Sequence, residues 1–156
     1  MGTSTEKITN IDEIGVAQEE NVQEIAGLNR QFHLDIEDFE WDKPEWIKEE
    51  IGKGNYYILK QCGLVLGAID LQKIDADEIY IEAIAVDSAS HGLGIGKKLI
   101  DYAKQRAREM GCKKISVESF ESYDLLGFYQ RVGFGLDNPP TGYYEGKPFH
   151  RFVMNL

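Results

Sequence analysis

His91-Gly-Leu-Gly-Ile-Gly96 stands between a nearly all-apolar run, Ile79 to Val86, and a segment with helical periodicity. Its three alternating glycines allow positive φ angles and let other groups approach the backbone closely. Backbone N–H groups in such a turn, together with the partial positive charge of a helix N-terminus, favour an anion. Lys97 and Lys98 add positive charge in the first helical turn. The segment therefore predicts a strand–turn–helix unit that binds a phosphate or pyrophosphate.

The glycine pattern alone also fits two other structures. One is a strand-to-helix connection that binds no ligand. The other is a dinucleotide-binding fold, but its fingerprint is G-x-G-x-x-G, and here Leu99 stands at the third glycine position. A Walker loop is excluded because the chain contains no G-x-x-x-x-G-K-[ST] sequence.

Hydrophobic periodicity and turn residues around this unit predict the remaining elements. A right-handed crossover makes the strands on either side of the glycine turn parallel, while short turns make the other strands antiparallel. The sequence thus predicts an α/β fold with a mixed, mostly antiparallel central sheet flanked by helices. The expected strands are Ile11 to Val16, Tyr56 to Leu59, Leu64 to Leu71, Ile79 to Val86, Ile115 to Glu118 and Phe149 to Leu156; the expected helices are Glu19 to His33, Pro44 to Gly52, Ile95 to Met110 and Asp124 to Arg131.

Length and composition indicate an ordinary globular protein. The chain has 156 residues, of which 42% are hydrophobic and 28% charged, so we expect one domain over residues 11–156. Residues 1–10 lack a secretory or myristoylation pattern and are expected to be a loose end or a cloning remnant. The net charge of -10 argues against nucleic-acid binding. No apolar run is long enough for a membrane helix, and two widely spaced cysteines suit a reduced protein, so the expected location is cytoplasmic.

Two motifs resemble those of a known family. Ile84-Ala-Val-Asp87, followed after three residues by His91-Gly-Leu-Gly-Ile-Gly-Lys-Lys-Leu99, is similar to the cofactor-binding signature of the Gcn5-related N-acetyltransferases, [QR]-x-x-G-x-[GA]. Gly127-Phe-Tyr-Gln-Arg-Val-Gly-Phe134 resembles that family's second hallmark. The expected order of elements also matches the family over nearly the whole chain.

The resemblance implies an acetyltransferase fold that binds acetyl-CoA and transfers its acetyl group to a primary amine in a ternary complex. The backbone of one strand would pair with the pantetheine arm, and the glycine turn would hold the pyrophosphate. Tyr129 would lie beside the sulfur of coenzyme A. The expected cofactor-binding residues are Ile84, Ala85, Val86, His91, Gly92, Leu93, Gly94, Ile95, Gly96, Lys97 and Ser122.

The chain departs from the family pattern at two of these positions. His91 stands where Arg or Gln is usual, so we expect weaker or pH-dependent cofactor binding rather than none. Ser122 stands where many members have Asn, and a serine can still donate to the cofactor or cap the following helix.

Glu82 and Tyr129 are the expected catalytic residues. A lysine-type amine has a pKa near 10.4 and must lose a proton before it attacks. Glu82 is the one carboxylate in the run Ile79 to Val86, where desolvation would make it a better base, acting directly or through water; an ion-paired surface glutamate is the alternative. Tyr129 stays protonated at neutral pH and can donate to the departing thiolate; a core aromatic is the alternative. Tyr80 shares a face with Glu82 by the period of a strand, and could assist or merely pack.

The acceptor is not identified by the sequence. Acidic residues between Asp35 and Glu40 could attract a cationic amine, but they also fit a solvated loop. The three histidines have no metal-ligand spacing, so no metal is expected. Cys112 as a covalent nucleophile and His150 as part of the acceptor site are weaker alternatives. Many relatives dimerise, which makes a homodimer one expectation. A non-catalytic acyl-CoA sensor of the same fold remains the alternative function.

Overall fold

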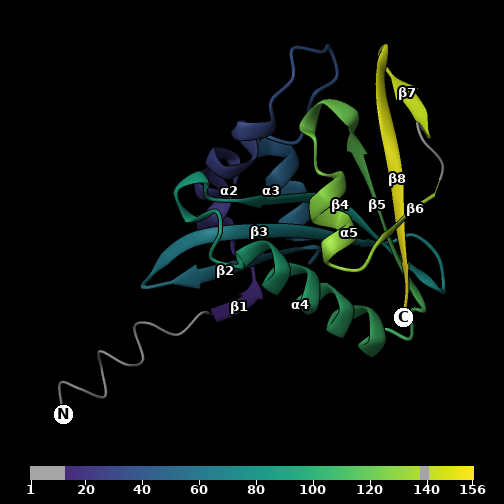
Figure 1. Ribbon diagram of the computed structural model, residues 1–156. Coiled ribbons are helices and arrows are strands. Elements are labelled where there is room, and N and C mark those ends of the chain that lie inside the picture. Colours follow the sequence, from purple (N-terminus) through teal and green to yellow (C-terminus); the bar gives the residue numbers. More distant parts are fainter. Residues whose placement is uncertain (1–12, 138–140) are drawn as a thin grey trace. The chain divides into compact units, whose positions relative to one another are not determined.

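The computed structural model describes residues 13–137 and 141–156, so the expectation for residues 1–10 lies outside the described part of the chain. The strands form one eight-stranded sheet in the order β1-β2-β3-β4-β5-β8-β6, with β7 paired to β8 (Figure 1). β4 pairs with β5 in parallel, whereas the pairs β1–β2, β2–β3, β5–β8, β6–β8 and β7–β8 are antiparallel. The predicted mixed, mostly antiparallel sheet is therefore confirmed. The strands are β1 (Glu13–Val16), β2 (Tyr56–Gln61), β3 (Leu64–Lys73), β4 (Glu78–Val86), β5 (Lys114–Phe120), β6 (Gly135–Leu136), β7 (Gly142–Tyr144) and β8 (Lys147–Asn155); the helices are α2 (Val22–Asn29), α3 (Pro44–Gly52), α4 (Ile95–Glu109) and α5 (Leu126–Arg131).

The described residues group into two compact units, and β3, β4 and α4 contribute residues to both. The first unit contains the described residues up to Asp70 together with Ala83–Leu99. The second contains Leu71–Glu82 and the described residues from Ile100 to Leu156. The glycine turn therefore belongs to the first unit, whereas Glu82 and Tyr129 belong to the second.

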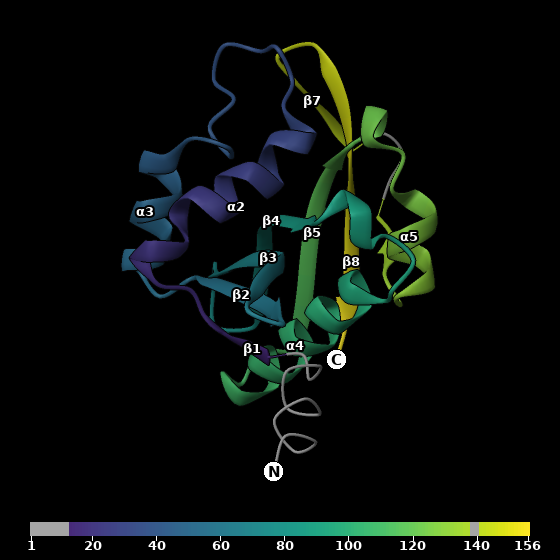
Figure 2. The ribbon, with the colours of Figure 1, turned by 90° about the vertical axis from the view of Figure 1, so that its left-hand side faces the viewer.

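In the first unit, β2 and β3 form the predicted hairpin. Cys62 and Gly63 make its turn with φ angles of 54° and 79°, and a type I′ turn requires positive φ at both central positions. Helices α2 and α3 lie side by side (Figure 2). Their apolar faces share a core with fully buried Tyr56, whose hydroxyl oxygen accepts a hydrogen bond from Asn29 Nδ2 at 2.8 Å. Pro44 begins α3 and Gly52 ends it, as predicted.

The first predicted helix is shorter than expected. Its α-helical part is Val22–Asn29, flanked by 3₁₀ turns at Glu19–Asn21 and Arg30–Phe32. At its end the His33 N–H donates to the Arg30 carbonyl three residues earlier, a bond typical of a tightened last turn. The amphipathic pattern located the helix, but it does not distinguish α from 3₁₀ geometry at the ends.

In the second unit, a buried carboxylate joins three strands. Glu78 on β4 accepts hydrogen bonds from the Ser116 hydroxyl on β5 and from Arg151 Nη2 on β8, the latter at 3.0 Å. Lys114 Nζ lies 3.3 Å from the same carboxylate. Burial raises the pKa of Glu78, but these donors outweigh burial and hold the pKa below its usual value. The resulting stability is present at neutral pH and is lost as pH falls through that lowered pKa.

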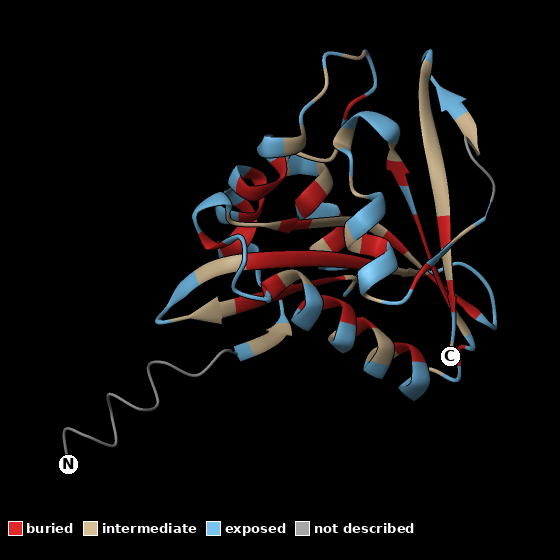
Figure 3. Ribbon diagram, in the orientation of Figure 1, coloured by how far each residue is buried: buried red, intermediate tan, exposed pale blue. Residues whose placement is uncertain are grey.

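Helix α4 carries the predicted buried stripe. Ile95, Leu99, Ala103 and Ala107 are all buried, whereas the opposite side of the helix is exposed (Figure 3). Met110, the last residue predicted for the stripe, lies just after the helix and is half-buried. Gly111 follows with a φ of 75°, which is the left-handed conformation that commonly ends a helix.

Candidate active site

A short segment connects β4 to α4, and hydrogen bonds to β3 and within the segment hold it in place. The Asp87 N–H donates to the Leu66 carbonyl at 2.8 Å, and the Ser90 hydroxyl donates to Asp87 Oδ2 at 3.1 Å. Gly92 and Gly94 follow with φ angles of 87° and 77°. Residues with a side chain rarely adopt such φ angles. The turn that leads into α4 therefore favours glycine at these two positions.

Helix α4 begins with N–H groups that its own helical hydrogen bonds do not use. The first helical hydrogen bond runs from the Lys98 N–H to the Gly94 carbonyl at 3.1 Å. The N–H groups of Ile95, Gly96 and Lys97 therefore precede the helical bonding ladder, as in any helix N-terminus. A Cβ at Gly92 or Gly94 would meet no atom within 4 Å, so the turn is open. This arrangement fits an anion such as a pyrophosphate.

One predicted donor of this turn is already engaged. The Leu93 N–H points to the Ser90 carbonyl at 3.3 Å, so it does not enter the cradle in this conformation. His91, whose imidazole replaces the usual Arg or Gln, is exposed at the beginning of the turn. The start of α4 therefore suits an anion better than the glycine loop before it does.

Gly67 on β3 brings the start of α4 close to the sheet. A Cβ there would come within 2.9 Å of Ile95 Cγ2 and 3.0 Å of Leu99 Cδ1, which is shorter than van der Waals contact. Ile95 and Leu99 are fully buried, so neither has room to move freely. Gly67 was not among the predicted site residues. Nothing in the local pattern of the strand marks it, because the close approach involves residues about thirty positions later.

The last residues of β4 carry the backbone that we expected to bind the pantetheine arm. Ala85 is buried, whereas Ile84 and Val86 are half-buried. The Val86 carbonyl accepts a hydrogen bond from Gln31 Nε2 at 3.0 Å, and the same nitrogen donates to the Leu28 carbonyl at 2.8 Å. Gln31 was not predicted, and it ties the 3₁₀ turn after α2 to the end of this strand.

Glu82 lies on β4 two residues after Tyr80, and a second carboxylate, Glu118 on β5, also lies close to Tyr80. The Tyr80 hydroxyl donates to Glu118 Oε1 on β5 at 3.2 Å. Burial, followed by the negative charges of Glu82 and Glu118, raises the pKa of Tyr80 well above its usual value. The parallel register pairs Ile81 with Val117, and Glu82 and Glu118 are the next residue on each strand. Glu82 is half-buried, and the predicted shared face with Tyr80 agrees with this electrostatic coupling.

Tyr129 is fully buried in an aromatic cluster. Its ring stacks on Phe152 with a centroid distance of 4.9 Å and meets Phe128 and Phe134 edge-on. Burial raises the pKa of its hydroxyl well above the usual value. Within residues 13–137 and 141–156 this hydroxyl has no hydrogen-bond partner. Tyr129 is therefore both a core aromatic and a protonated donor with free bonding capacity.

A match to a family model identifies the chain. The model described as "Acetyltransferase (GNAT) family" matches residues 17–134, which include the glycine turn and both predicted catalytic positions. The chain belongs to the GNAT acetyltransferase family. The predicted resemblance is thus confirmed for the family and for its fold.

Relatives and solved structures of this GNAT protein agree with that assignment. Blasticidin-S acetyltransferase of Streptomyces morookaense is 37% identical over 79 residues, 50% of this chain and 57% of the relative's length. Ard1 from Thermoplasma volcanium superposes with a TM-score of 0.80 at 18% identity, covering 93% of this chain and 97% of its own. Rv2747 from Mycobacterium tuberculosis, solved with CoA and NLQ, gives a TM-score of 0.75 at 19% identity, with 92% and 99% covered. At these identities the solved structures demonstrate the shared fold.

Two more residues considered from the sequence, Ser122 and Cys112, differ in their exposure to solvent. Ser122 is exposed in the 3₁₀ turn Glu121–Tyr123, just after β5. Cys112, considered as a nucleophile, is buried, and its thiol lies 3.8 Å from the Ala76 carbonyl. The described residues contain no group of His, Cys, Asp or Glu that could hold a metal ion. None of the helices in the described part of the chain is long and apolar enough to span a membrane.

Several aromatic side chains pack within the first unit, whereas one on β7 is exposed. Phe39 is buried and meets the rings of His33 and Trp41 edge-on. Trp46 packs against Tyr56 in the core of the first unit. Tyr143 on β7 is the most exposed of these aromatics. Phe39 and Trp46 therefore contribute to packing in the first unit.

Proposed function

We propose that this protein is an N-acetyltransferase that transfers the acetyl group of acetyl-CoA to a primary amine. The observation that carries the proposal is the open glycine turn, whose positive φ angles at Gly92 and Gly94 lead into the N-terminus of a long helix. Family membership supports the same activity. Acetyl-CoA supplies a thioester, whose acetyl group is transferred and whose thiolate departs.

The chain's own backbone would hold the cofactor. The N–H groups of Gly92, Gly94, Ile95, Gly96 and Lys97 are suited to the pyrophosphate, and the α4 dipole favours its charge. The strand backbone of Ile84, Ala85 and Val86 is suited to the amide-rich arm. A backbone N–H near Ala85 or Val86 would face the negative charge that develops on the carbonyl oxygen. Ser122 and His91 would complete the contacts, with weaker effect.

Glu82 would accept the proton of the attacking amine, directly or through water. It is half-buried on β4, and it lies close enough to Tyr80 for its negative charge to raise the pKa of that hydroxyl. Tyr129 would donate its hydroxyl hydrogen to the departing thiolate. Because burial raises its pKa, we expect a strong hydrogen bond rather than complete proton transfer to be its contribution.

The charge of the chain supports a cationic acceptor. A net charge of -10 weakly favours amines, which are protonated at neutral pH, as acceptors, whereas the anionic cofactor would rely on the local positive end of α4. The two free cysteines are compatible with a reducing compartment such as the cytoplasm.

Calorimetric titration tests the proposal directly. Purified protein should bind acetyl-CoA with a micromolar dissociation constant, and ATP should bind much more weakly because it lacks the pantetheine arm. A thiol-release assay with a panel of primary amines should then detect turnover. Absence of acetyl-CoA binding by the folded protein would reject the proposal, whereas binding without turnover on any amine would favour the acyl-CoA sensor.

Tyr129→Phe should lower turnover while acetyl-CoA affinity stays nearly unchanged. The phenyl ring keeps the stacking on Phe152, so the fold is preserved and only the donor hydroxyl is lost. Loss of a positioned donor is expected to reduce kcat by about 100-fold. Steady-state kinetics and the same titration measure the two effects. Tyr143→Phe, which removes a hydroxyl from an exposed ring, is the matched control; unchanged kcat in Tyr129→Phe would remove this hydroxyl from the mechanism.

A further inference from the structure

Tyr80 on β4 lies near two carboxylates, and its hydroxyl hydrogen is committed to one of them. The hydroxyl donates to Glu118 Oε1 on β5 at 3.2 Å, whereas Glu82, two residues further along β4, acts on Tyr80 through its charge. Tyr80 is half-buried and Glu118 is exposed, so a ligand from solvent can reach this bond. A hydroxyl has one hydrogen and two lone pairs, and Tyr80 therefore offers a ligand only its capacity as an acceptor.

Tyr80, Glu82 and Glu118 share one face of the sheet. Successive strand residues point to opposite faces, so Tyr80 and Glu82 alternate with the buried Ile81 on β4. The parallel register places Tyr80 beside Ser116, two residues before Glu118 on β5. The hydroxyl therefore reaches diagonally, toward the end of β4 that carries the proposed base.

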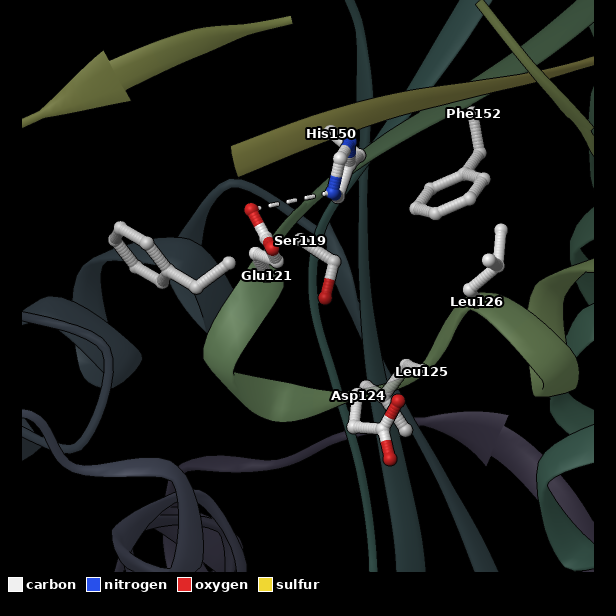
Figure 4. Close-up of a pocket in the computed structure, with 8 residues that line it drawn as sticks. Ser119, Glu121, Asp124, Leu125, Leu126, His150 and Phe152 are labelled. Atoms are coloured by element: carbon white, nitrogen blue, oxygen red, sulfur yellow. Dashed lines mark ion pairs between the residues drawn. The ribbon is translucent and has the colours of Figure 1, made fainter. Parts of the chain in front are cut away.

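The pocket drawn in Figure 4 belongs to the opposite face. It has a volume of about 220 Å³, and the residues that line it include Ser119, Glu121 and His150. Ser119 follows Glu118 directly on β5, so the two side chains point to opposite sides of the sheet. An amine that reaches the proposed base Glu82 must therefore approach the face that carries Glu118, not this pocket.

The acceptor capacity of this face is available to a ligand. Among the described residues, the Tyr80 oxygen accepts no hydrogen bond and the Glu118 carboxylate forms no ion pair. Arg151, whose positive charge also acts on Tyr80, lies 3.0 Å from the buried Glu78 and 3.6 Å from Asp137. Burial and the nearby carboxylates raise the pKa of Tyr80, so its hydroxyl stays protonated and does not compete for the proton of the amine.

We propose that the Tyr80 hydroxyl oxygen accepts a hydrogen bond from the acyl-accepting amine, and that Glu118 is the positioning residue that fixes this polarity. The assignment rests on the proposed acetyltransferase function. By holding the hydroxyl hydrogen, Glu118 also keeps it away from Glu82, because a hydrogen bond donated to that carboxylate would weaken it as a base. The amine nitrogen is then held by an oriented acceptor on the same face as its base.

This arrangement selects primary over secondary amines. A primary ammonium has three N–H protons. The first passes to Glu82 and frees the lone pair that forms the C–N bond; the second is lost as the C–S bond breaks, and it balances the charge of the departing thiolate. The third stays on nitrogen in the amide product and bonds to Tyr80 throughout. A secondary ammonium has two such protons and loses both, so the Tyr80 oxygen loses its partner during the reaction.

Initial rates at saturating acetyl-CoA test the assignment with 2-phenylethylamine, propylamine and Nα-acetyllysine amide. All variants are compared on whichever of these primary amines the wild-type protein uses with the highest kcat/KM, and on the N-methyl derivative of that amine. The wild-type kcat/KM should be about tenfold or more higher for the primary amine. Tyr80→Phe should raise KM for the primary amine about tenfold with a smaller change in kcat, and should reduce this preference.

Variants of Glu118 separate positioning from packing. Glu118→Gln keeps an acceptor oxygen for the Tyr80 hydroxyl and should keep KM close to the wild-type value. Glu118→Leu removes the acceptor, so the hydroxyl is expected to turn to Glu82; KM should rise about tenfold and kcat should also fall. Adding Tyr80→Phe to Glu118→Leu removes the misdirected hydroxyl and should return kcat toward the value of Tyr80→Phe alone.

Thermal unfolding and titration with acetyl-CoA accompany every variant. Tyr143→Phe, which removes a hydroxyl from an exposed ring on β7, should leave KM unchanged. The assignment is overturned if Tyr80→Phe keeps the wild-type KM and preference, if Glu118→Gln is as impaired as Glu118→Leu, or if the effects of Tyr80→Phe and Glu118→Leu on kcat add. If the wild-type protein acetylates none of the three amines, the proposed function itself is rejected and the role of Tyr80 falls with it.

Discussion

Gly94→Glu should abolish acetyl-CoA binding without unfolding the protein. Gly94 is exposed, has a φ of 77°, and caps α4 by accepting the first helical hydrogen bond from Lys98. A glutamate there places a carboxylate at the helix N-terminus, where it interacts favourably with the dipole and partly offsets the strain of positive φ. The same carboxylate occupies and repels the expected pyrophosphate position. Loss of two charge-assisted hydrogen bonds corresponds to roughly 3–6 kcal/mol, or about 10²–10⁴-fold in affinity.

Calorimetric titration of acetyl-CoA, with thermal unfolding measured in parallel, checks this expectation. Gly63→Glu is the matched control, because Gly63 has a similar φ of 79° and open space, but lies in the β2–β3 turn. Gly63→Glu should lower the unfolding temperature through the strain of positive φ, but its affinity for acetyl-CoA should stay unchanged. Normal affinity in a folded Gly94→Glu protein would mean that the pyrophosphate does not lie at the start of α4.

Elements with strong local signals were predicted to within a few residues. Pro44 and Gly52 bracket α3, and Gly111 with positive φ follows α4, because proline and glycine act on the backbone at their own positions. The parallel pairing of β4 and β5 followed from the handedness of the crossover between them. These features do not depend on contacts between distant residues, so they could be predicted from the sequence.

Elements that depend on a partner strand were missed or cut short. β7 has only three residues, and its turn, Glu145 and Gly146, lacks the Asn-Gly or Asp-Gly pair that marks a hairpin. β6 has two residues and exists only through its pairing with β8. The last strand consequently begins at Lys147 rather than at the predicted Phe149. Such short strands have no periodicity of their own to detect.

In the candidate site, too, residues marked by local motifs were predicted, and residues brought together by tertiary contacts were not. The motifs placed the glycine turn and Tyr129, whereas Gly67, Gln31 and the bond from Tyr80 to Glu118 were not anticipated. The Tyr80–Glu118 bond joins residues 38 positions apart, and only the register of two parallel strands brings them together. The pocket at Glu121 and His150 likewise depends on how β5 and β8 pair, since Ser119 lies opposite His150. Tertiary contacts of this kind leave no local pattern in the sequence.

Glu82→Gln should lower kcat by about 10²–10⁴-fold at neutral pH, the usual range for loss of a general base. Glutamine preserves the size of the side chain beside Tyr80 but cannot accept a proton from the amine. The deficit should also depend on pH. For an amine with a pKa near 10.4, the neutral fraction increases as pH rises. The variant can use this neutral amine, which no longer needs a base. The ratio of wild-type to variant kcat/KM should therefore shrink between about pH 7 and pH 9.5.

Initial rates of thiol release across this pH range, at saturating acetyl-CoA, measure the effect. Glu118→Gln is the matched comparison, because Glu118 is also a carboxylate beside Tyr80. Unlike Glu82, Glu118 is exposed and accepts a hydrogen bond from the Tyr80 hydroxyl. A base at position 82 predicts a large, pH-dependent deficit for Glu82→Gln and a small, pH-independent one for Glu118→Gln. A deficit of constant size for Glu82→Gln would indicate a positioning or packing role, because disturbed packing is not relieved by raising pH. Equal deficits in the two variants would mean that the paired carboxylates act through Tyr80 rather than through proton transfer at Glu82.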